Sequence, residues 1–480
     1  MSQKSPFRLH RSVSRPAKVL VFLMTFAAAG NTFAGKTYDT SKHGHPETGV
    51  QRLPEEGRGA CAQCHDEHGS RDGVSNGGPF NRALFTVDDE TLCYSCHTLE
   101  SSNMAYPGNV VWADSTHATS PDVWWRGPVP RARTSADAGK CVNCHDPHGA
   151  DDATGAIPSM VRLREEAQCT GCHNGIAAKD VKTQTAKAYR HPFQWSERHT
   201  AAEGKSSLPA QYDDSGVSAR RHAECADCHN AHVSRPDIVP AMAPEASQRL
   251  FGVSRIRVVN GVAGTRPTYE WRGAEDLFDP REYEVCFKCH SSWTTLPVGK
   301  PDLAVLTNPS NPSYHPIQGR GRNVNIDPQA FVSGWSWDSM LYCADCHGSD
   351  DALVRGPHGS INAYILKAPV VTTPAFQTAS PTDLCFSCHR WEVYGDSKAN
   401  NATQQASRFN RPNGRGHAFH VGGQDVPCYA CHVTHGSTTH PALVATGRNP
   451  GMVIYTQTAG GGSCTPTCHN ARSYTVNYAR

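Results

Sequence analysis

The chain has little of the apolar material that a conventional protein core requires. Only 38% of its 480 residues are hydrophobic and its mean hydropathy is −0.53, whereas glycine and proline contribute 41 and 33 residues. A chain this polar, and this rich in residues that interrupt helices and strands, buries too little apolar surface to offset the entropy of folding. After residue 34 no apolar run is long enough to span a bilayer. The polypeptide alone is therefore not expected to form a large side-chain core.

The chain also has no cysteine outside one recurring pattern. Its 20 cysteines form ten motifs, nine reading Cys-x-x-Cys-His and the last reading Cys-x-x-x-Cys-His. In such a motif the two thiols form thioether bonds to a c-type haem, and the adjacent histidine becomes the proximal iron ligand. The predicted attachment residues are Cys61, Cys64, Cys93, Cys96, Cys141, Cys144, Cys169, Cys172, Cys225, Cys228, Cys286, Cys289, Cys343, Cys346, Cys385, Cys388, Cys428, Cys431, Cys464 and Cys468. The predicted proximal ligands are His65, His97, His145, His173, His229, His290, His347, His389, His432 and His469. We therefore expect ten molecules of haem c, whose flat rings replace side chains as core material.

Paired cysteines also build zinc sites and disulfide frameworks. Neither of these requires a histidine directly after every pair, and histidine is only 26 of the 480 residues. The regular following histidine therefore favours haem at the motifs. The Cys464 motif has one extra residue between its thiols, and Pro466 would stiffen that loop. A longer loop can still bring both sulfurs to one ring edge, so we expect haem there as well.

Residues 1–34 have the pattern of a secretory signal peptide. Five Lys and Arg residues precede an apolar segment at 19–29. Thr32-Phe33-Ala34 then fits a small-residue cleavage site. Removing the segment leaves 41 basic and 44 acidic residues, and haem propionates would add negative charge. We expect an exported protein of the periplasm, the outer membrane or the cell exterior, with redox proteins and no nucleic acid as partners.

The motifs alternate between two kinds, which divides the chain into five haem pairs. The first motif of each pair is followed by a further histidine, here called the trailing histidine, and the second motif is not. The trailing histidines are His68, His148, His232, His358 and His435. The expected units are residues 35–116, 117–190, 191–314, 315–416 and 417–480.

The trailing histidines are candidate distal iron ligands. His65 and His68 are three residues apart, too close to reach both faces of one porphyrin, so the trailing histidine must serve another haem. We expect that haem to be the second of its own pair, at Cys93, Cys169, Cys286, Cys385 or Cys464.

The first haem of each pair then requires a ligand from upstream. The expected upstream histidines are His45, His117, His191, His315 and His417. A proline after His45, His191 or His315 favours an extended backbone there. His199 is an alternative to His191, and His420 to His417; His43, His222 and His440 are spare. Methionine is a weaker alternative, because its few positions keep no fixed register with the motifs.

Ten candidate distal ligands for ten irons predict six-coordinate, low-potential haems that carry electrons and bind no substrate. We therefore expect no catalytic residue. A multihaem reductase of nitrogen or sulfur oxyanions would require at least one open iron, and its usual sign, a substituted motif histidine, is not found.

The expected fold is a multihaem cytochrome c: mostly irregular coil, with short helices and a few hairpins, wrapped around a chain of ten haems. Helical runs are expected at 161–168 and 281–285. Asn260-Gly261, between the β-branched segment 255–259 and Val262-Ala263, predicts a two-residue hairpin turn.

The repeated pattern His … Cys-x-x-Cys-His-Asp-Pro-His-Gly … Cys-x-x-Cys-His resembles the doubled-motif multihaem cytochromes. These include the decahaem subunits of porin–cytochrome conduits of the Mtr, Pio and DmsE types, and, more loosely, extracellular cytochrome filaments. The resemblance implies electron transfer through closely spaced bis-histidine haems, with a porin or further copies of the chain as partners. This chain has about 45 residues per haem after signal removal, more than conduit subunits have, and insertions such as 236–282 thicken it.

Overall fold

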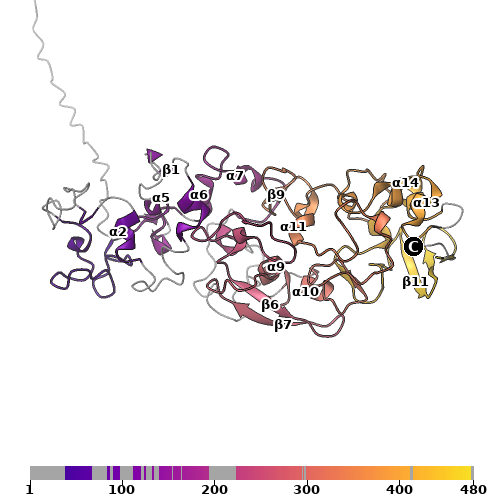
Figure 1. Ribbon diagram of the computed structural model, residues 1–480, viewed down its shortest axis with the longest axis horizontal. Helices are drawn as coiled ribbons and strands as arrows, with labels where there is room; N and C mark the ends of the chain where they lie inside the picture. Colours follow the sequence, from indigo (N-terminus) through magenta and orange to yellow (C-terminus); the bar gives the residue numbers. More distant parts are fainter. Residues whose placement is uncertain are drawn as a thin grey trace, which may run out of the picture.

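The computed structural model describes residues 38–66, 84–86, 90–97, 112–120, 124–125, 132–133, 140–153, 155–163, 165–193, 223–294, 296, 299–410 and 415–476. The molecule is elongated, and the chain advances along the long axis in sequence order (Figure 1). The expected signal segment, His68, His199 and His222 lie outside the described residues. Among the residues described, no helix combines the length and apolar character needed to cross a membrane.

The helices are short, as expected for a chain rich in glycine and proline. The longest described helix, α9, has nine residues. The α-helices are α2 (Glu90–Tyr94), α4 (Thr116–Thr119), α5 (Cys141–Cys144), α6 (Glu165–Thr170), α7 (Val181–Gln184), α8 (Cys225–Cys228), α9 (Glu282–His290), α10 (Leu303–Leu306), α11 (Cys343–Cys346), α12 (Trp391–Tyr394), α13 (Asn401–Gln405), α14 (His417–Gln424) and α15 (Cys428–Cys431). The 3-10 helices are η1 (Cys61–Gln63), η4 (Pro158–Met160), η7 (Gln248–Leu250), η8 (Pro328–Ala330), η9 (Ala363–Ile365) and η10 (Leu384–Ser387).

The strands form small antiparallel sheets. Local pairs are β1 (Trp124–Trp125) with β2 (Ala132–Arg133), β3 (Asp151–Asp152) with β4 (Gly155–Ala156), and β6 (Arg255–Val259) with β7 (Thr268–Arg272). The C-terminal sheet has the order β11 (Met452–Thr458), β12 (Gly461–Pro466) and β13 (Arg472–Thr475). The structure is therefore mostly coil with short helices and hairpins, as predicted.

Two short ladders join distant segments. The strand β5 (Tyr189–Arg190) pairs with β9 (Gly359–Ser360), and β8 (Ser313–Tyr314) pairs with β10 (Gly436–Ser437). Each ladder therefore holds an upstream histidine, His191 or His315, beside the trailing histidine of the next unit.

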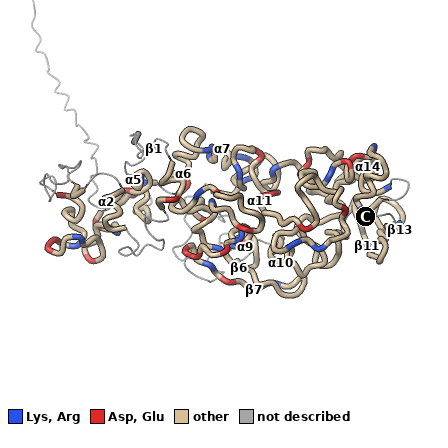
Figure 2. The backbone as a smooth tube through the Cα atoms, viewed as in Figure 1, with Lys and Arg blue, Asp and Glu red and all other residues tan. Residues whose placement is uncertain are grey.

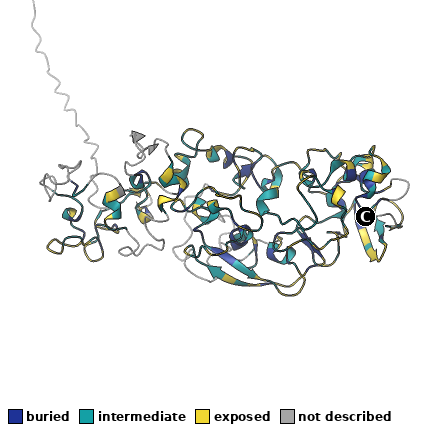
Figure 3. Cartoon of the chain, in the orientation of Figure 1, coloured by how far each residue is buried: buried dark blue, intermediate teal, exposed yellow. Residues whose placement is uncertain are grey.

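The side-chain core consists of small clusters (Figure 3). In the larger one, Ile256 of β6, Phe287 of α9 and Ala304 of α10 pack around Trp293. The Trp293 ring stacks on Trp271 of β7 at a centroid distance of 5.4 Å. The hairpin β6–β7 thus serves as a platform for α9, which carries the Cys286 motif.

The β6–β7 hairpin is confirmed, but its predicted turn is wrong. Asn260-Gly261 begins the connection, yet the second strand starts at Thr268, so Val262 and Ala263 lie in a longer loop. Hydrogen bonds to a later segment of the chain hold this loop: the Asn260 side chain donates to Gln318 Oε1 (2.8 Å), and the backbone amide of Gly264 donates to Asn311 Oδ1 (3.0 Å).

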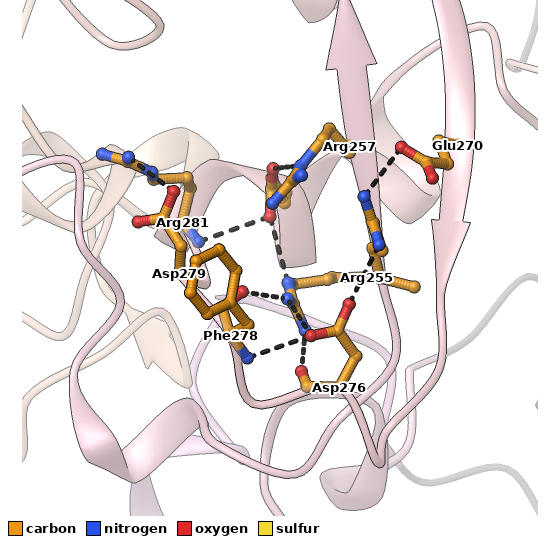
Figure 4. Close-up of polar contacts among 9 residues, drawn as sticks. Arg255, Arg257, Glu270, Asp276, Phe278, Asp279 and Arg281 are labelled. Carbon is orange, nitrogen blue, oxygen red and sulfur yellow. Dashed lines mark hydrogen bonds and ion pairs between the residues drawn. The ribbon is translucent and has the colours of Figure 1, made fainter.

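A buried arginine fastens this hairpin to α9 (Figure 4). Arg255 is 2% exposed, and its Nε lies 3.1 Å from a carboxylate oxygen of Glu284, which is equally buried. The same guanidinium donates to the backbone oxygens of Asp276 and Phe278 and lies 3.3 Å from the Asp276 carboxylate. Arg255 and Glu284 are thus buried as a hydrogen-bonded ion pair, the arrangement in which buried charges are tolerated.

Candidate haem sites and the histidine pairs

The first motif of each pair forms its own single helical turn. These turns are η1, α5, α8, α11 and α15, and each begins at the first cysteine. The amide of the motif histidine closes the turn on the carbonyl of that cysteine, for example His145 to Cys141 at 2.9 Å and His432 to Cys428 at 2.9 Å. One turn of helix brings both thiols and the histidine to one side, as attachment to a single ring requires.

The second motifs are placed differently. Those at Cys93, Cys169 and Cys286 lie at the C-terminal parts of α2, α6 and α9, and the Cys385 motif begins in η10. The tenth motif has no helix, since Cys464 lies in strand β12. Its extra residue, Thr467, is held by its backbone amide on the carbonyl of Gly451 at 2.9 Å.

Imidazole rings from distant parts of the chain meet in pairs. The trailing histidines form the pairs His148–His65 (6.0 Å between ring centroids), His232–His145 (5.9 Å), His358–His229 (6.0 Å) and His435–His347 (6.1 Å). The other pairs are His43–His97 (5.8 Å), His117–His173 (6.2 Å), His191–His290 (6.2 Å), His417–His432 (6.0 Å) and His420–His469 (6.3 Å).

These separations fit two imidazoles on one iron. A metal–imidazole nitrogen bond is about 2 Å long, so two rings on opposite sides of one metal have centroids roughly 6 Å apart. For His389 the neighbour is His315. Burial lowers the pKa of His389 to about 4, and the nearby charge of His315 is the next largest cause. Every proximal histidine thus has a histidine partner in the structure.

The predicted pairing of the trailing histidines is wrong. His148 was expected opposite His173, but it lies opposite His65, the first motif histidine of the preceding unit. The same backward shift of one unit holds for His232, His358 and His435. For His358 and His435 the physical reason is a strand pairing: β9 and β10, which directly follow these histidines, pair with β5 and β8, which lie well before them in the chain.

The predicted pairing of the upstream histidines is wrong as well. His117 and His191 lie opposite His173 and His290, the second motif histidines of their units. Among the residues that the structure describes, no motif histidine faces His45; its Nδ1 accepts hydrogen bonds from the amides of Glu47 and Thr48. The spare His43 takes the place opposite His97.

Only the last unit keeps the expected upstream pairing. His417 lies opposite His432, and its alternative, His420, lies opposite His469. Both come from α14, three residues apart on one face of the helix. One helix therefore supplies the partners of both motif histidines of this unit.

Hydrogen bonds orient the upstream rings. The Nδ1 atoms of His43, His117 and His191 bond the carbonyls of Pro147, Ala231 and Pro357 at 3.1, 3.1 and 2.9 Å. His315 does the same with Thr434. A bond from Nδ1–H to a carbonyl leaves the Nε2 lone pair free for a metal. Each acceptor directly precedes a trailing histidine, so the two histidine sets position one another.

The first-motif histidines are held by a backbone clasp that the sequence did not reveal. His145, His347 and His432 bond through Nδ1 to the carbonyls of Ser159, Tyr364 and Ala442 at 3.0, 2.8 and 3.0 Å. These three acceptors have positive φ, at 58°, 61° and 53°, as do the residues that follow them. Left-handed backbone costs a non-glycine residue about 1–2 kcal/mol, so nothing in these residue types signals the clasp.

The sites open into one continuous cavity of about 4660 Å³, lined by both cysteines of the eight motifs from Cys141 to Cys468. This volume is several times the roughly 300–1,000 Å³ of an ordinary ligand pocket. Within it, the Nδ1 atoms of His173, His358, His389 and His417 are buried and have no hydrogen-bond partner among the described residues. Adjoining sites with unsatisfied imidazoles fit a row of large flat cofactors with bound metal.

The motifs follow one another in space as they do in sequence. Thiols of successive pairs lie close enough to affect one another: Cys169 raises the pKa of Cys225, Cys286 that of Cys343, and Cys428 that of Cys385. Within units, charge on Cys172 raises the pKa of Cys144, after burial, and Cys388 is likewise affected by Cys346. The cavity is therefore a linear series of attachment sites.

Two segments of the chain match the family model of the doubled CXXCH motif. They are residues 134–178 and 338–393, which hold the Cys141–Cys169 and Cys343–Cys385 motif pairs. Comparison with curated proteins and with solved structures finds no match. Doubled CXXCH segments bind haem c covalently, and the chain is consistent with a multihaem c-type cytochrome that transfers electrons.

Proposed function

We propose that the protein conducts electrons through ten haems, one at each motif, arranged in sequence order along the molecule. The observation that carries the proposal is the set of histidine pairs, each with the separation that two ligands of one iron require. Bound haem supplies reversible one-electron chemistry at iron.

The protein's own residues prepare these sites. The carbonyl bonds to Nδ1 fix the ring orientation and direct Nε2 toward the iron position. Burial lowers the pKa of His232, His358 and His435 to about 4, so these ligands are neutral at pH 7. Two histidines on each iron leave no position for substrate, which supports conduction over a reductase activity.

The elongated shape and the serial motifs suit transfer from one end of the molecule to the other (Figure 1). Acidic and basic residues are interspersed along the described chain (Figure 2). We propose an exported protein in respiratory or extracellular electron transfer, accepting electrons from one redox protein and passing them to another. A porin of the outer membrane and further copies of the chain are the candidate assembly partners.

The proposal is tested by counting haems and examining their spin state in the purified exported protein. A pyridine haemochrome assay should give ten haems per chain, and ferric EPR should show low-spin iron throughout. A count of nine haems would contradict haem attachment at the Cys464 motif. A high-spin signal that shifts on addition of nitrite would instead support a reductase.

A further inference from the structure

Helix α9 carries three buried charged side chains. Glu282, Glu284 and Lys288 are 7%, 2% and 1% exposed. Glu284 is neutralised by Arg255 at 3.1 Å. Within the described part of the chain, Glu282 and Lys288 form no ion pair; their partners are backbone and hydroxyl groups. These two charges therefore remain uncompensated in a region of low dielectric.

Lys288 is directed at the motif that precedes α9. Its Nζ donates to the carbonyl of Asp227 in α8 at 2.8 Å and to Ser254 Oγ at 3.3 Å. Asp227 lies between Cys225 and Cys228, so the ammonium group sits against the attachment turn of the fifth haem. Consistent with this, Lys288 offsets part of the increase that burial causes in the pKa of Cys228.

Glu282 is directed at the motif that follows α9. Its two carboxyl oxygens accept hydrogen bonds from the amides of Cys343 (2.7 Å) and Ala344 (2.9 Å), the first residues of α11. Burial raises the pKa of Glu282, but the two amide hydrogen bonds act in the opposite direction. Because both oxygens accept from N–H groups, the hydrogen-bond geometry fits the carboxylate form. The carboxylate also lies within 4.8 Å of the sulfurs of Cys286 and Cys343, at the turn of the seventh haem.

The fifth and seventh attachment turns are otherwise the same. Both read Cys-Ala-Asp-Cys-His. In each, the aspartate caps its own turn, Asp227 accepting from Glu224 N at 2.7 Å and Asp345 from Tyr342 N at 2.9 Å. The aspartate charges therefore cancel in any comparison of the two sites.

The motif histidines of these two turns are also held alike. Both bond a backbone carbonyl through Nδ1, at 3.0 Å for His229 and 2.8 Å for His347. Each also faces a trailing histidine, His358 or His435. Arg249 near one site and Lys367 near the other are exposed and of the same sign. The fifth turn also has two half-buried carboxylates nearby, Glu166 and Glu224. The residue that α9 contributes to each site is more deeply buried, so it is the charge least screened by solvent there.

We propose that α9 imposes unequal reduction potentials on two haems held by equivalent attachment turns: Lys288 raises the potential of the haem at Cys225, and Glu282 lowers that of the haem at Cys343. A nearby positive charge stabilises the haem that has gained an electron, and a negative charge destabilises it. An electron in this stretch therefore resides on the fifth haem in preference to the seventh. The sixth haem, borne by α9 itself, experiences both charges. The inference rests on the proposed function, in that both sites hold haem.

The test is an NMR-monitored redox titration of the whole haem-loaded protein. Signals of the two haems are assigned through His358→Met and His435→Met variants, each of which alters one site. In the unaltered protein the haem at Cys225 should be reduced first. Equal potentials, or the reverse order, in a protein with ten low-spin haems would overturn the inference, whereas missing haem at either site would count against the proposed function instead.

Charge-removing variants then separate the two contributions. Glu282→Gln should raise the potential of the seventh haem and Lys288→Gln should lower that of the fifth, each changing the electron partition between them by about tenfold, or about 59 mV for a one-electron couple. The exposed Glu275→Gln has the same charge change as Glu282→Gln and should shift neither. Lys288→Arg retains the charge and should keep the order. Potentials unmoved by Glu282→Gln would show a purely structural cap and overturn this part of the inference.

Discussion

The trailing and upstream histidines occupy equivalent ligand positions but connect different parts of the chain. Trailing histidines reach back to the preceding unit, as His358 does to His229. Upstream histidines stay within their own unit, as His191 does with His290. The first set therefore joins units, and the second completes them. Continuity of the proposed conductor depends on the trailing set, because each of its members would fix the first haem of one unit with a side chain of the next.

Acidification should distinguish the trailing from the upstream histidines, because the two sets should be protonated at different pH. Of the changes considered, it should affect the largest number of irons. Burial and nearby histidine charge lower the pKa of His232 and His435 to about 4. For His117 and His191 burial also lowers the pKa, but their carbonyl bonds raise it back in part. Because the pKa is depressed, stability begins to fall as pH drops below the unfolded value of about 6.5. A ligand is itself protonated, and displaced, only as pH falls through its lowered pKa.

The upstream ligands should therefore be displaced first as pH falls. We expect the haems at Cys169 and Cys286 to become high-spin at higher pH than those at Cys141 and Cys343. Assigned haem methyl NMR signals recorded during a pH titration would measure this order. Simultaneous conversion of all four would show that the carbonyl bonds do not distinguish the sets.

Replacing one trailing histidine should affect both a haem and the junction between units. His358→Ala removes the partner of His229, so roughly one iron in ten should become high-spin in ferric EPR. Thermal unfolding should also occur at lower temperature, because the ligand that links the third and fourth units is lost. The matched control is His440→Ala, which removes a histidine that faces no motif histidine among the described residues and should leave the spectrum unchanged.

Replacing the corresponding upstream histidine should have a smaller structural effect. His191→Ala also opens roughly one iron in ten, at Cys286, but leaves the link between His358 and His229 in place. It additionally removes the 2.9 Å bond to Pro357 O, so the haem at Cys225 should shift slightly in its EPR g-values. A loss of thermal stability as large as that of His358→Ala would contradict the division of roles.

The smallest expected difference is a local one, between the effects of replacing His43 and His45, which lie two residues apart. His43→Ala should open the haem at Cys93, whereas His45→Ala should leave every haem low-spin, since His45 only accepts local amide bonds. Low-temperature EPR of the two variants checks this. A high-spin signal in His45→Ala alone would restore the ligand that the His-Pro pattern indicated.

Much of the local structure was predictable. The coil-rich character, the short helices and the strand β6 (Arg255–Val259) follow from composition and short-range sequence pattern. The long β6–β7 connection was not predictable, because Asn260 and Gly264 are held by Gln318 and Asn311, which are about 50 residues away along the chain. The clasps at Ser159, Tyr364 and Ala442 were equally hidden, since residues of these types rarely adopt positive φ.

The sequence by itself determined where each attachment motif lies and which residue types surround it, because a cysteine pair and its histidine form a turn through hydrogen bonds within five residues. It also determined that distal histidines are available in sufficient number. Only the tertiary structure decided which histidine meets which, because the paired rings are contributed by segments as far apart as His65 and His148 or His229 and His358. That choice depends on how neighbouring units pack, and no local pattern contains it.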